Sequence, residues 1–464
     1  MEPRSLKFIA DAVRGESRGA PSDTMVARVC TDSRLAEPGD LFIALSGERF
    51  DAHRFLPEVA SRGVAAIIAE RRKLPADFRA CAVIVVDDTR RALGELGARY
   101  RMDFTLPIVA VGGSNGKTTT KELIASVLRQ KRATLWSEAS FNNEVGVPLT
   151  LLRLERAHQA AVLETGANHP GELAPLLRWI APRYGVLTNI GREHLEFFGD
   201  LAGVAQEEGV VAACLPPGGA LFINGDSEFA DGIAVRSRAR VVRAGLGDRN
   251  DFRVERIRID DRGAAFRVKT PNAALDGEYR IQLLGRHQAV NAALALAVGA
   301  ELGLDAPSIA RGLEACAPPK WRMQLLDASG VRLLADAYNA NADSMIAALQ
   351  TLCELPCKGR RVAALGDMAE LGEASAAAHA EVGRRVAESR LDQLFAVGQR
   401  ATGIAAAARG GGMTSVTEIL EVESAARAVR EFARPGDIVL VKASRSMRLE
   451  RIIDAFTNPA ANHH

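Results

Sequence analysis

The stretch IVAVGGSNGKTTTKELIASVL, residues 108–128, decides the fold. It begins with an apolar run and passes through a glycine loop into a segment in which apolar residues recur at helical spacing (Leu123, Ile124, Val127 and Leu128). A strand, a glycine loop and an amphipathic helix in this order predict a phosphate-binding loop, because N–H groups at the start of a helix stabilise phosphate oxygens. The loop has the short form G-x-x-G-K-T, since Val111 stands where the longer form has its first glycine.

This loop predicts the binding of ATP together with Mg2+. Lys117 is expected to reach the β- and γ-phosphates, and the hydroxyl of Thr118 is expected to bind the metal ion. The other loop residues expected to contact the nucleotide are Gly113, Ser114, Asn115, Gly116 and Thr119. The alternative interpretation is a glycine-rich turn that carries an exposed lysine.

Two further polar residues follow predicted strands. Glu164 ends the run AAVLE, and His194 follows VLTNIG in the segment GREHLE. Ligands of open α/β sheets bind beyond the carboxyl ends of the strands, so we expect Thr118, Glu164 and His194 to converge there and to hold metal. Taken singly, Glu164 could instead cap a helix that starts near Pro170, and His194 could be a loop histidine with its own partners.

The rest of the chain alternates short apolar runs with helical patterns, which predicts an α/β protein. A length of 464 residues suits about three domains at ~150 residues each. We expect a small α/β domain over 1–104 and a central domain over 105–316, with a mostly parallel, doubly wound sheet. The alternating stretch 252–270 adds a small antiparallel hairpin to that sheet, and a Rossmann-like domain is expected over 317–464.

Composition excludes several classes of function. The 59 Lys and Arg residues nearly balance the 57 Asp and Glu residues, so the basic excess of a nucleic-acid-binding protein is missing. No apolar run approaches the ~18 residues of a membrane span, and the first residues carry no apolar signal segment. Six scattered cysteines suit a reducing compartment, with Cys353 and Cys357 interpreted as structural. A cytoplasmic protein is therefore expected.

Beyond these patterns, the sequence resembles the Mur ligase family, the ATP-dependent amide ligases of peptidoglycan precursor synthesis. Members of this family use the short form of the loop. The likeness covers the whole chain, through TDSRLAEPGDLFIALSGERFDAHRF, SFNNEVGVPLTLL, ETGANHPGEL, TNIGREHLE, GRHQAVNAALALA, DAYNANADSM, LGDMAELG and VKASRS. GANHPGE and the last three motifs are most similar to those of the member that adds D-alanyl-D-alanine to UDP-N-acetylmuramoyl tripeptide.

The resemblance implies ATP, Mg2+ and these two substrates, and it implies roles for single residues. The carboxylate of the tripeptide would be phosphorylated and then attacked by the amine of the dipeptide, with Lys117, Glu164, His194, Glu208 and Arg322 as catalytic residues. Asn291, Asp336, Tyr338 and Asn339 would contact the nucleoside. The residues expected to contact substrate are Ser33, Arg34, Ser46 and Gly47 for the uridine nucleotide, Asn142 and Asn143 for the acceptor, and Lys442, Ser444 and Arg445 for the dipeptide.

The sequence departs from the family pattern at three positions. Glu208, in GVAQEEG, stands where many members have a lysine that CO2 converts to a metal-binding carbamate. We infer that Glu208, helped by Glu207, replaces the carbamate; the alternative is that both are solvent-facing acids on a helix. Trp321 replaces a glycine before Arg322, and Ala342 replaces a proline.

Two other functions stay open at the level of sequence. One is a relative that adds a single amino acid, although the C-terminal Asp-Asn-Pro-Arg type motif of the third-residue-adding ligase is missing here. The other is a nucleotide-binding homologue without ligase activity. The family implies a monomer, and the third residue of the peptide, lysine or diaminopimelate, is left undetermined.

Overall fold

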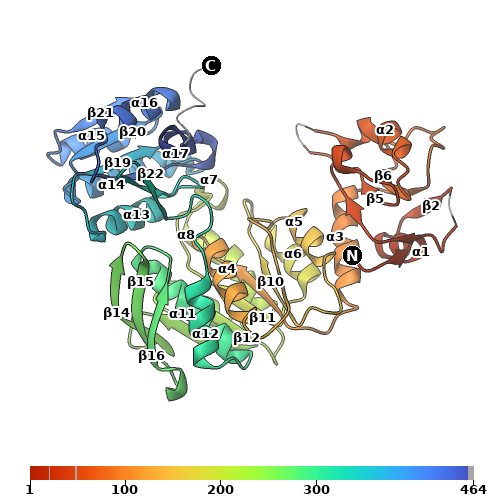
Figure 1. Ribbon diagram of the computed structural model, residues 1–464. Coiled ribbons are helices and arrows are strands. Elements are labelled where there is room, and N and C mark those ends of the chain that lie inside the picture. The colour runs from red at the N-terminus through yellow and green to blue at the C-terminus, as the bar shows by residue number, and fades with distance from the viewer. Residues whose placement is uncertain (20, 48–49, 458–464) are drawn as a thin grey trace.

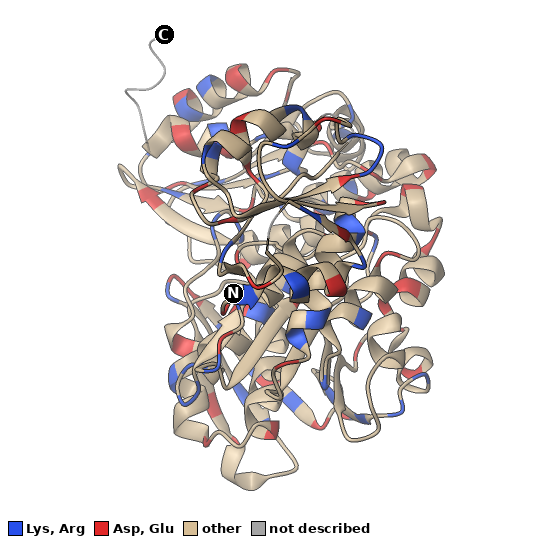
Figure 2. Ribbon diagram, turned by 90° about the vertical axis from the view of Figure 1, so that its right-hand side faces the viewer, with Lys and Arg blue, Asp and Glu red and all other residues tan. Residues whose placement is uncertain are grey.

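The computed structural model describes residues 1–19, 21–47 and 50–457, which form three α/β units in chain order. Figure 1 shows the first unit in red to orange, the central unit in orange to teal and the last in teal to blue. Figure 2 shows Lys and Arg interspersed with Asp and Glu along the ribbon, in keeping with the nearly balanced composition.

The first unit contains a five-stranded sheet in the order β2-β7-β6-β5-β4, in which only β2 is antiparallel to its neighbour. Its strands are β2 (Glu16–Arg18), β4 (Val29–Cys30), β5 (Leu41–Ile43), β6 (Ala66–Glu70) and β7 (Val83–Val86). A separate pair joins β1 (Arg4–Ser5) to β3 (Met25–Val26). The helices are α1 (Leu6–Val13), α2 (Leu56–Ser61) and α3 (Thr89–Arg101).

The central unit is built on a nine-stranded sheet in the order β16-β15-β14-β13-β12-β11-β8-β10-β9. The strands are β8 (Ile108–Gly112), β9 (Thr134–Trp136), β10 (Ala160–Glu164), β11 (Tyr184–Leu187), β12 (Ala220–Asn224), β13 (Arg240–Gly245), β14 (Phe252–Asp260), β15 (Gly263–Lys269) and β16 (Gly277–Ile281). Strands β8 to β14 run parallel, whereas β15 and β16 pair antiparallel, which confirms the predicted hairpin.

Strand β8 explains why this sheet is covered on both faces. Successive side chains of a strand point to opposite faces, so Ile108 and Ala110 enter one hydrophobic core while Val109 and Val111 enter another. The first core is closed by α5 (Gly146–Leu151), α6 (Leu173–Ile180) and α9 (Val210–Ala213). The second is closed by α4 (Lys117–Leu128), α11 (Arg286–Glu301) and α12 (Ala306–Ala315). The predicted doubly wound sheet is therefore confirmed.

The last unit has a six-stranded sheet in the order β17-β18-β22-β19-β20-β21, parallel except for the edge strand β17. Its strands are β17 (Gln324–Ala328), β18 (Val331–Ala335), β19 (Arg361–Gly366), β20 (Gln393–Val397), β21 (Val416–Ile419) and β22 (Ile438–Lys442). The helices are α13 (Ala342–Glu354), α14 (Ser375–Glu388), α15 (Thr402–Gly410), α16 (Val422–Phe432) and α17 (Glu450–Thr457). This arrangement is the expected Rossmann-like one.

Helix α3 connects the first two units through a shared core. It packs against α1 of the first unit and against α5 and α6 of the central unit. Two glycines permit the close approach: a Cβ on Gly94 would lie 2.2 Å from the ring of Trp179, and one on Gly97 would lie 3.0 Å from Pro148. The division at 104 and 316 remains a prediction, because the core runs through the first of these points.

The short helices α7 (Leu195–Phe198), α8 (Leu201–Glu208) and α10 (Ala230–Ala234) complete the central unit. Over residues 1–19, 21–47 and 50–457, no helix has both the length and the apolar character needed to cross a membrane. All six cysteines are free, as expected for a chain without a disulfide framework.

Candidate active site

The glycine loop joins β8 to α4 and adopts a conformation that needs its glycines. Gly113 and Gly116 have φ values of +109° and +86°. A Cβ on Gly113 would lie 2.4 Å from the hydroxyl of Thr188, and one on Gly116 would lie 2.9 Å from the amide of Asn291. The loop thus exposes the first N–H groups of α4, as the sequence predicts.

Lys117, the first residue of α4, is folded back over this loop. Its Nζ donates to the carbonyls of Gly113 at 2.5 Å and Ser114 at 3.1 Å, and lies 3.2 Å from a carboxylate oxygen of Glu193. Burial disfavours the charge, but Glu193, Glu208 and Glu164 outweigh it, so the pKa of Lys117 is raised above its ordinary value. The lysine is therefore a stable cation beside the phosphate-binding loop.

Thr118 and Glu164 each keep an oxygen atom free for a ligand. Both residues are buried, and neither Thr118 Oγ1 nor Glu164 Oε2 has a hydrogen-bond partner among the described residues. The other carboxylate oxygen, Oε1, accepts from Asn142 at 3.0 Å, and Lys121 Nζ lies 4.0 Å from Oε2. Glu164 does not cap the following helix, because α6 begins only at Leu173.

These free oxygens fit Mg2+, a hard cation that prefers oxygen ligands and usually takes few of them from protein when phosphates are present. The described ranges contain no group of three or more His, Cys, Asp or Glu residues that could hold a metal ion. Mg2+ would thus be held by Thr118, Glu164 and nucleotide oxygens.

His194 points toward the last unit. Its Nδ1 lies 2.7 Å from a carboxylate oxygen of Glu370, although the contact lacks the alignment of a hydrogen bond. Both residues have left-handed backbone, with φ values of +49° and +59°. Such strain in non-glycine residues collects at functional sites.

The segment 192–194 connects the loop to the last unit. The guanidinium of Arg192 lies 2.6 Å from Asp343 and 2.5 Å from Glu381, and its backbone N–H donates to Asp343. In the loop itself, Asn115 accepts a hydrogen bond from Asn341 at 3.0 Å. The phosphate-binding loop therefore contacts the last unit directly.

Glu208 is buried against the loop. One of its carboxylate oxygens accepts from the N–H of Gly113 at 2.6 Å. Burial raises the pKa of Glu208 to about 7, although Lys117 and this hydrogen bond act in the opposite direction. Glu207 is also buried, and it caps α6 by accepting from Gly171 and Leu173, both at 2.8 Å. The alternative of two solvent-facing acids is thus wrong, and Glu207 serves the helix instead of the loop.

Of the four residues expected near the nucleoside, Asn291 lies on α11 against the loop and donates to Gln288 at 2.9 Å. The other three, Asp336, Tyr338 and Asn339, follow β18 at the junction of the central and last units. Lys442 lies 2.6 Å from Asp336 and donates to the carbonyl of Asn339 at 2.9 Å. Lys442, which is expected from the sequence to contact the dipeptide, therefore contacts two residues that are expected to contact the nucleoside.

Arg322 and Tyr338 form a second contact between units. The guanidinium carbon of Arg322 lies 3.9 Å from the ring centroid of Tyr338, whose hydroxyl is 2.6 Å from that of Ser140. Ser140 lies in the loop between β9 and α5, which also holds Asn142 and Asn143. Asn142 is the partner of Glu164, and the carboxamide oxygen of Asn143 accepts from Gly146 at the start of α5. This loop therefore connects Arg322 with Glu164 through Oε1, the carboxylate oxygen that already has a partner.

Ser444 and Arg445 follow β22. The hydroxyl of Ser444 accepts from Ala369 at 2.8 Å and is buried, and the guanidinium of Arg445 lies 2.7 Å from Glu450. Arg445 also approaches the ring of Trp321 at 5.1 Å. Among the described residues, Arg445 forms no hydrogen bond or ion pair with the glycine loop, so its role in binding the dipeptide stays a prediction.

The residues expected to hold the uridine nucleotide follow two neighbouring parallel strands, β4 and β5. Ser33 is buried, whereas Arg34 is exposed and pairs with Asp32. The hydroxyl of Ser46 donates to Asp51 and accepts from Lys73 at 2.6 Å. Gly47 continues the same loop, whose residues 48 and 49 lie outside the described ranges.

Sequence reasoning missed several residues of the site. The charged residues Arg192 and Glu193 lie inside a motif that predicts a site only through its histidine, and Glu370 lies in LGDMAELG. Arg90 belongs to a stretch with a helical pattern, yet it donates to the carbonyl of Ser46 at 2.8 Å and lies 2.6 Å from Glu144. The only sequence signal for these residues was the run of charged residues beside the histidine, at positions 192–194.

Comparison with known proteins agrees with this geometry. The family models described as Mur ligase family, catalytic domain; Mur ligase middle domain; and Mur ligase, glutamate ligase domain match residues 26–101, 111–299 and 321–445. The UDP-N-acetylmuramoyl-tripeptide--D-alanyl-D-alanine ligase of Escherichia coli (strain K12) is 36% identical, over 97% of this chain and 98% of that protein.

Two solved structures are similar over nearly the whole chain. MurF from Acinetobacter baumannii has a TM-score of 0.89 at 33% identity, covering 98% of this chain and 99% of that one. MurF ligase from Thermotoga maritima, in complex with ADP, has a TM-score of 0.82 at 27% identity, covering 93% and 97%.

Proposed function

Because this chain belongs to the Mur ligase family, we propose that it adds D-alanyl-D-alanine to UDP-N-acetylmuramoyl tripeptide with ATP, releasing ADP and phosphate. This ATP-dependent amide ligation is a step of peptidoglycan precursor synthesis. The observation that carries the proposal is the buried group of Lys117, Thr118 and Glu164 at the glycine loop, with two unpartnered oxygens beside a lysine cation.

ATP is expected to bind along the loop of residues 113–119, with its phosphates at the N–H groups of residues 116–119, and Lys117 would move from the loop carbonyls to the β- and γ-phosphates. The ADP complex of the Thermotoga relative supports nucleotide binding. Asn291, Asp336, Tyr338 and Asn339 would contact the nucleoside where the central and last units meet. Thr118 and Glu164, with His194 as the third proposed ligand, would hold Mg2+, which neutralises phosphate charge when bound.

In the reaction, an oxygen of the tripeptide carboxylate forms a bond to the γ-phosphorus, and the bond to the ADP oxygen breaks. The amine of the dipeptide then attacks the acyl carbon, loses a proton, and inorganic phosphate leaves. Lys117 and Arg322 would offset the negative charge that collects as two anions approach. Asn142 and Asn143 would orient the acceptor, and contacts between the units would exclude water.

The remaining substrate residues are proposed by position. Ser33, Arg34, Ser46 and Gly47 would contact the uridine nucleotide beyond the ends of β4 and β5. Lys442, Ser444 and Arg445 would serve the dipeptide, the first two by shaping the loops after β18 and β19, since both are buried. We further propose a cytoplasmic monomer, because the reaction consumes ATP and the residues assigned to the site all belong to one chain.

We also propose that Glu208 performs the task of the carbamylated lysine of other members. Its carboxyl group accepts from the N–H of Gly113 and faces Lys117, so it can supply a negative charge there without CO2 once it is deprotonated. Turnover is expected to be unaffected by bicarbonate. Glu208→Lys should restore bicarbonate stimulation; strong stimulation of the unaltered protein would contradict the proposal.

The decisive experiment follows phosphate release and product mass with ATP, Mg2+, UDP-N-acetylmuramoyl tripeptide and D-alanyl-D-alanine, omitting each in turn. We expect release only with all four, and a mass increase of one dipeptide. Use of a single amino acid in place of the dipeptide would favour the related ligase. ATP binding without turnover would favour the homologue that lacks ligase activity. Tripeptides ending in lysine or diaminopimelate should be compared in the same assay.

A further inference from the structure

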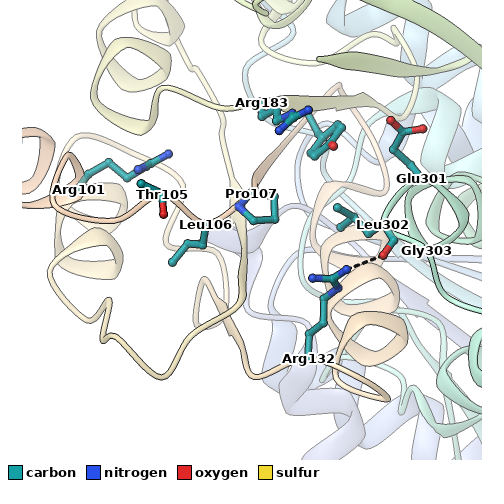
Figure 3. A pocket seen from close by; sticks show the side chains of 10 residues that line it. Arg101, Thr105, Leu106, Pro107, Arg132, Arg183, Glu301, Leu302 and Gly303 are labelled. Carbon is teal, nitrogen blue, oxygen red and sulfur yellow. Dashed lines mark hydrogen bonds between the residues drawn. The ribbon is translucent and has the colours of Figure 1, made fainter. Parts of the chain in front are cut away.

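A pocket of about 520 Å3 lies at the edge of the central sheet opposite the glycine loop (Figure 3). Pro107 and Arg183, which line it, directly precede β8 and β11, two neighbouring parallel strands. Both strands run from this pocket toward the edge that carries the glycine loop. The pocket is therefore separate from the candidate active site.

Three arginines from three different elements line this pocket. Arg101 is the last residue of α3, Arg132 follows α4 and Arg183 precedes β11. Figure 3 shows their side chains on different sides of the pocket. Sites that bind phosphate groups commonly use arginine in this way, because its planar fork of donors matches phosphate oxygens.

None of these arginines has a carboxylate within 4.0 Å among the described residues. They donate only to backbone carbonyls: Arg101 to Phe104 and Ile180, Arg132 to Leu302, and Arg183 to Gly218. An arginine has five N–H donors, so each guanidinium keeps at least three for a ligand.

No free carboxylate among the described residues of the lining neutralises the positive charge of the three arginines. Glu301 is the acidic residue of the lining, and its carboxylate is already paired with Arg240 outside the pocket. Burial lowers the pKa of Arg101, which is the effect of desolvation without an acidic neighbour. An anion entering the pocket would supply the missing charge.

We propose that this pocket binds a small organic phosphate. The three guanidiniums would hold the phosphate, and the wall formed by Leu106, Pro107 and Tyr184 would pack against the organic part. The volume lies within the ~300–1,000 Å3 of small-molecule sites. Because α4 begins at the glycine loop and ends at Leu128, four residues before Arg132, the occupant would lie near the far end of the helix that carries Lys117.

Calorimetric titration of the full chain with phenyl phosphate tests the proposal, since this probe joins a phosphate to an apolar ring. We expect saturable one-site binding that is at least tenfold weaker in the double variant Arg101→Gln/Arg183→Gln. Arg384→Gln, which removes an exposed arginine of α14, should leave the affinity unchanged. Inorganic phosphate should bind at least threefold more weakly than phenyl phosphate.

Two further variants distinguish this pocket from the glycine loop and from a general loss of folding. Thr105→Glu places a carboxylate at the exposed rim and leaves the three arginines and their backbone bonds intact, so it should weaken binding without loss of folding. Lys117→Ala should not affect binding. The proposal is overturned if the double variant and Thr105→Glu bind as well as the unaltered chain, if Lys117→Ala abolishes binding, or if inorganic phosphate binds equally well.

Discussion

Lys117 supplies the positive charge beside the glycine loop of the candidate site. It stands among three carboxylates and holds the loop carbonyls through its ammonium group. We predict that Lys117→Ala lowers kcat by about 10²- to 10³-fold, the loss typical of removing one group that stabilises developing charge. Phosphate release measures this. Lys7→Ala, on the exposed face of α1, is the matched control, and equal losses in both variants would contradict the assigned role.

Glu208 makes a prediction about pH. Its ordinary pKa is 4.5, and burial raises it to about 7 in the folded chain. Between these values the folded state binds more protons than the unfolded state, so the free energy of unfolding falls as pH rises. Glu208→Gln should flatten this fall between pH 5 and 7 by on the order of 1–3 kcal/mol.

Urea unfolding at pH 5, 6 and 7 would measure the effect. The control is Glu228→Gln, at an exposed position after β12, which should keep the slope of the unaltered chain. An unchanged slope in Glu208→Gln would show that this carboxyl does not hold a proton more tightly after folding.

The sequence predicts the glycine loop at the level of residues, because its glycines and lysine are consecutive. It does not predict the partners of Lys117 and His194, since Glu193 belongs to no pattern of its own and Glu370 lies 176 positions beyond His194. Contacts between distant segments depend on how the units are placed, and no local pattern encodes that placement. The roles of the predicted site residues still await the experiments above.

At the scale of elements, the close packing of α3 on α6 depends on a missing side chain. Gly94→Ala would place a Cβ 2.2 Å from the rigid ring of Trp179. We predict a loss of about 1–3 kcal/mol in the free energy of unfolding, as is usual for overpacking. Gly232→Ala, at an exposed position of α10 where a Cβ meets nothing within 4 Å, should gain about 0.4–1 kcal/mol. Urea unfolding of both variants distinguishes packing from chain entropy; equal changes would refute the packing account.

The strands and helices were predictable where periodicity was strong. The apolar run of β8 and the amphipathic α4 are encoded by neighbouring residues, and the β14–β15 hairpin is encoded by its alternation around 260–262. The sharing of α3 between two units was not predictable, because its apolar stripe is the same whichever unit it faces. Glu207 shows the same limit, since its role as a cap for α6 depends on tertiary packing.

At the scale of the whole molecule, Arg192 joins the central unit to the last. We predict that Arg192→Ala lowers kcat on the order of tenfold, because hydrogen bonds to charged groups contribute about 1.5–3 kcal/mol each. The radius of gyration measured by X-ray scattering should also rise in the absence of ligands. Arg384→Ala, exposed on α14, is the control; an unchanged radius and kcat in Arg192→Ala would mean that other contacts hold the units together.

The shared core around α3 has a consequence for recombining this chain with its relatives. The helix is continuous with the first unit in sequence, yet its glycines fit Trp179 and Pro148 of the central unit. A hybrid enzyme that takes its first unit, up to the loop after α3, from a relative would therefore contain an α3 whose side chains fit the central unit of that relative and not this one. A crossover before Thr89 would keep α3 with Trp179 and Pro148, and the foreign α1 and sheet would have to pack against it.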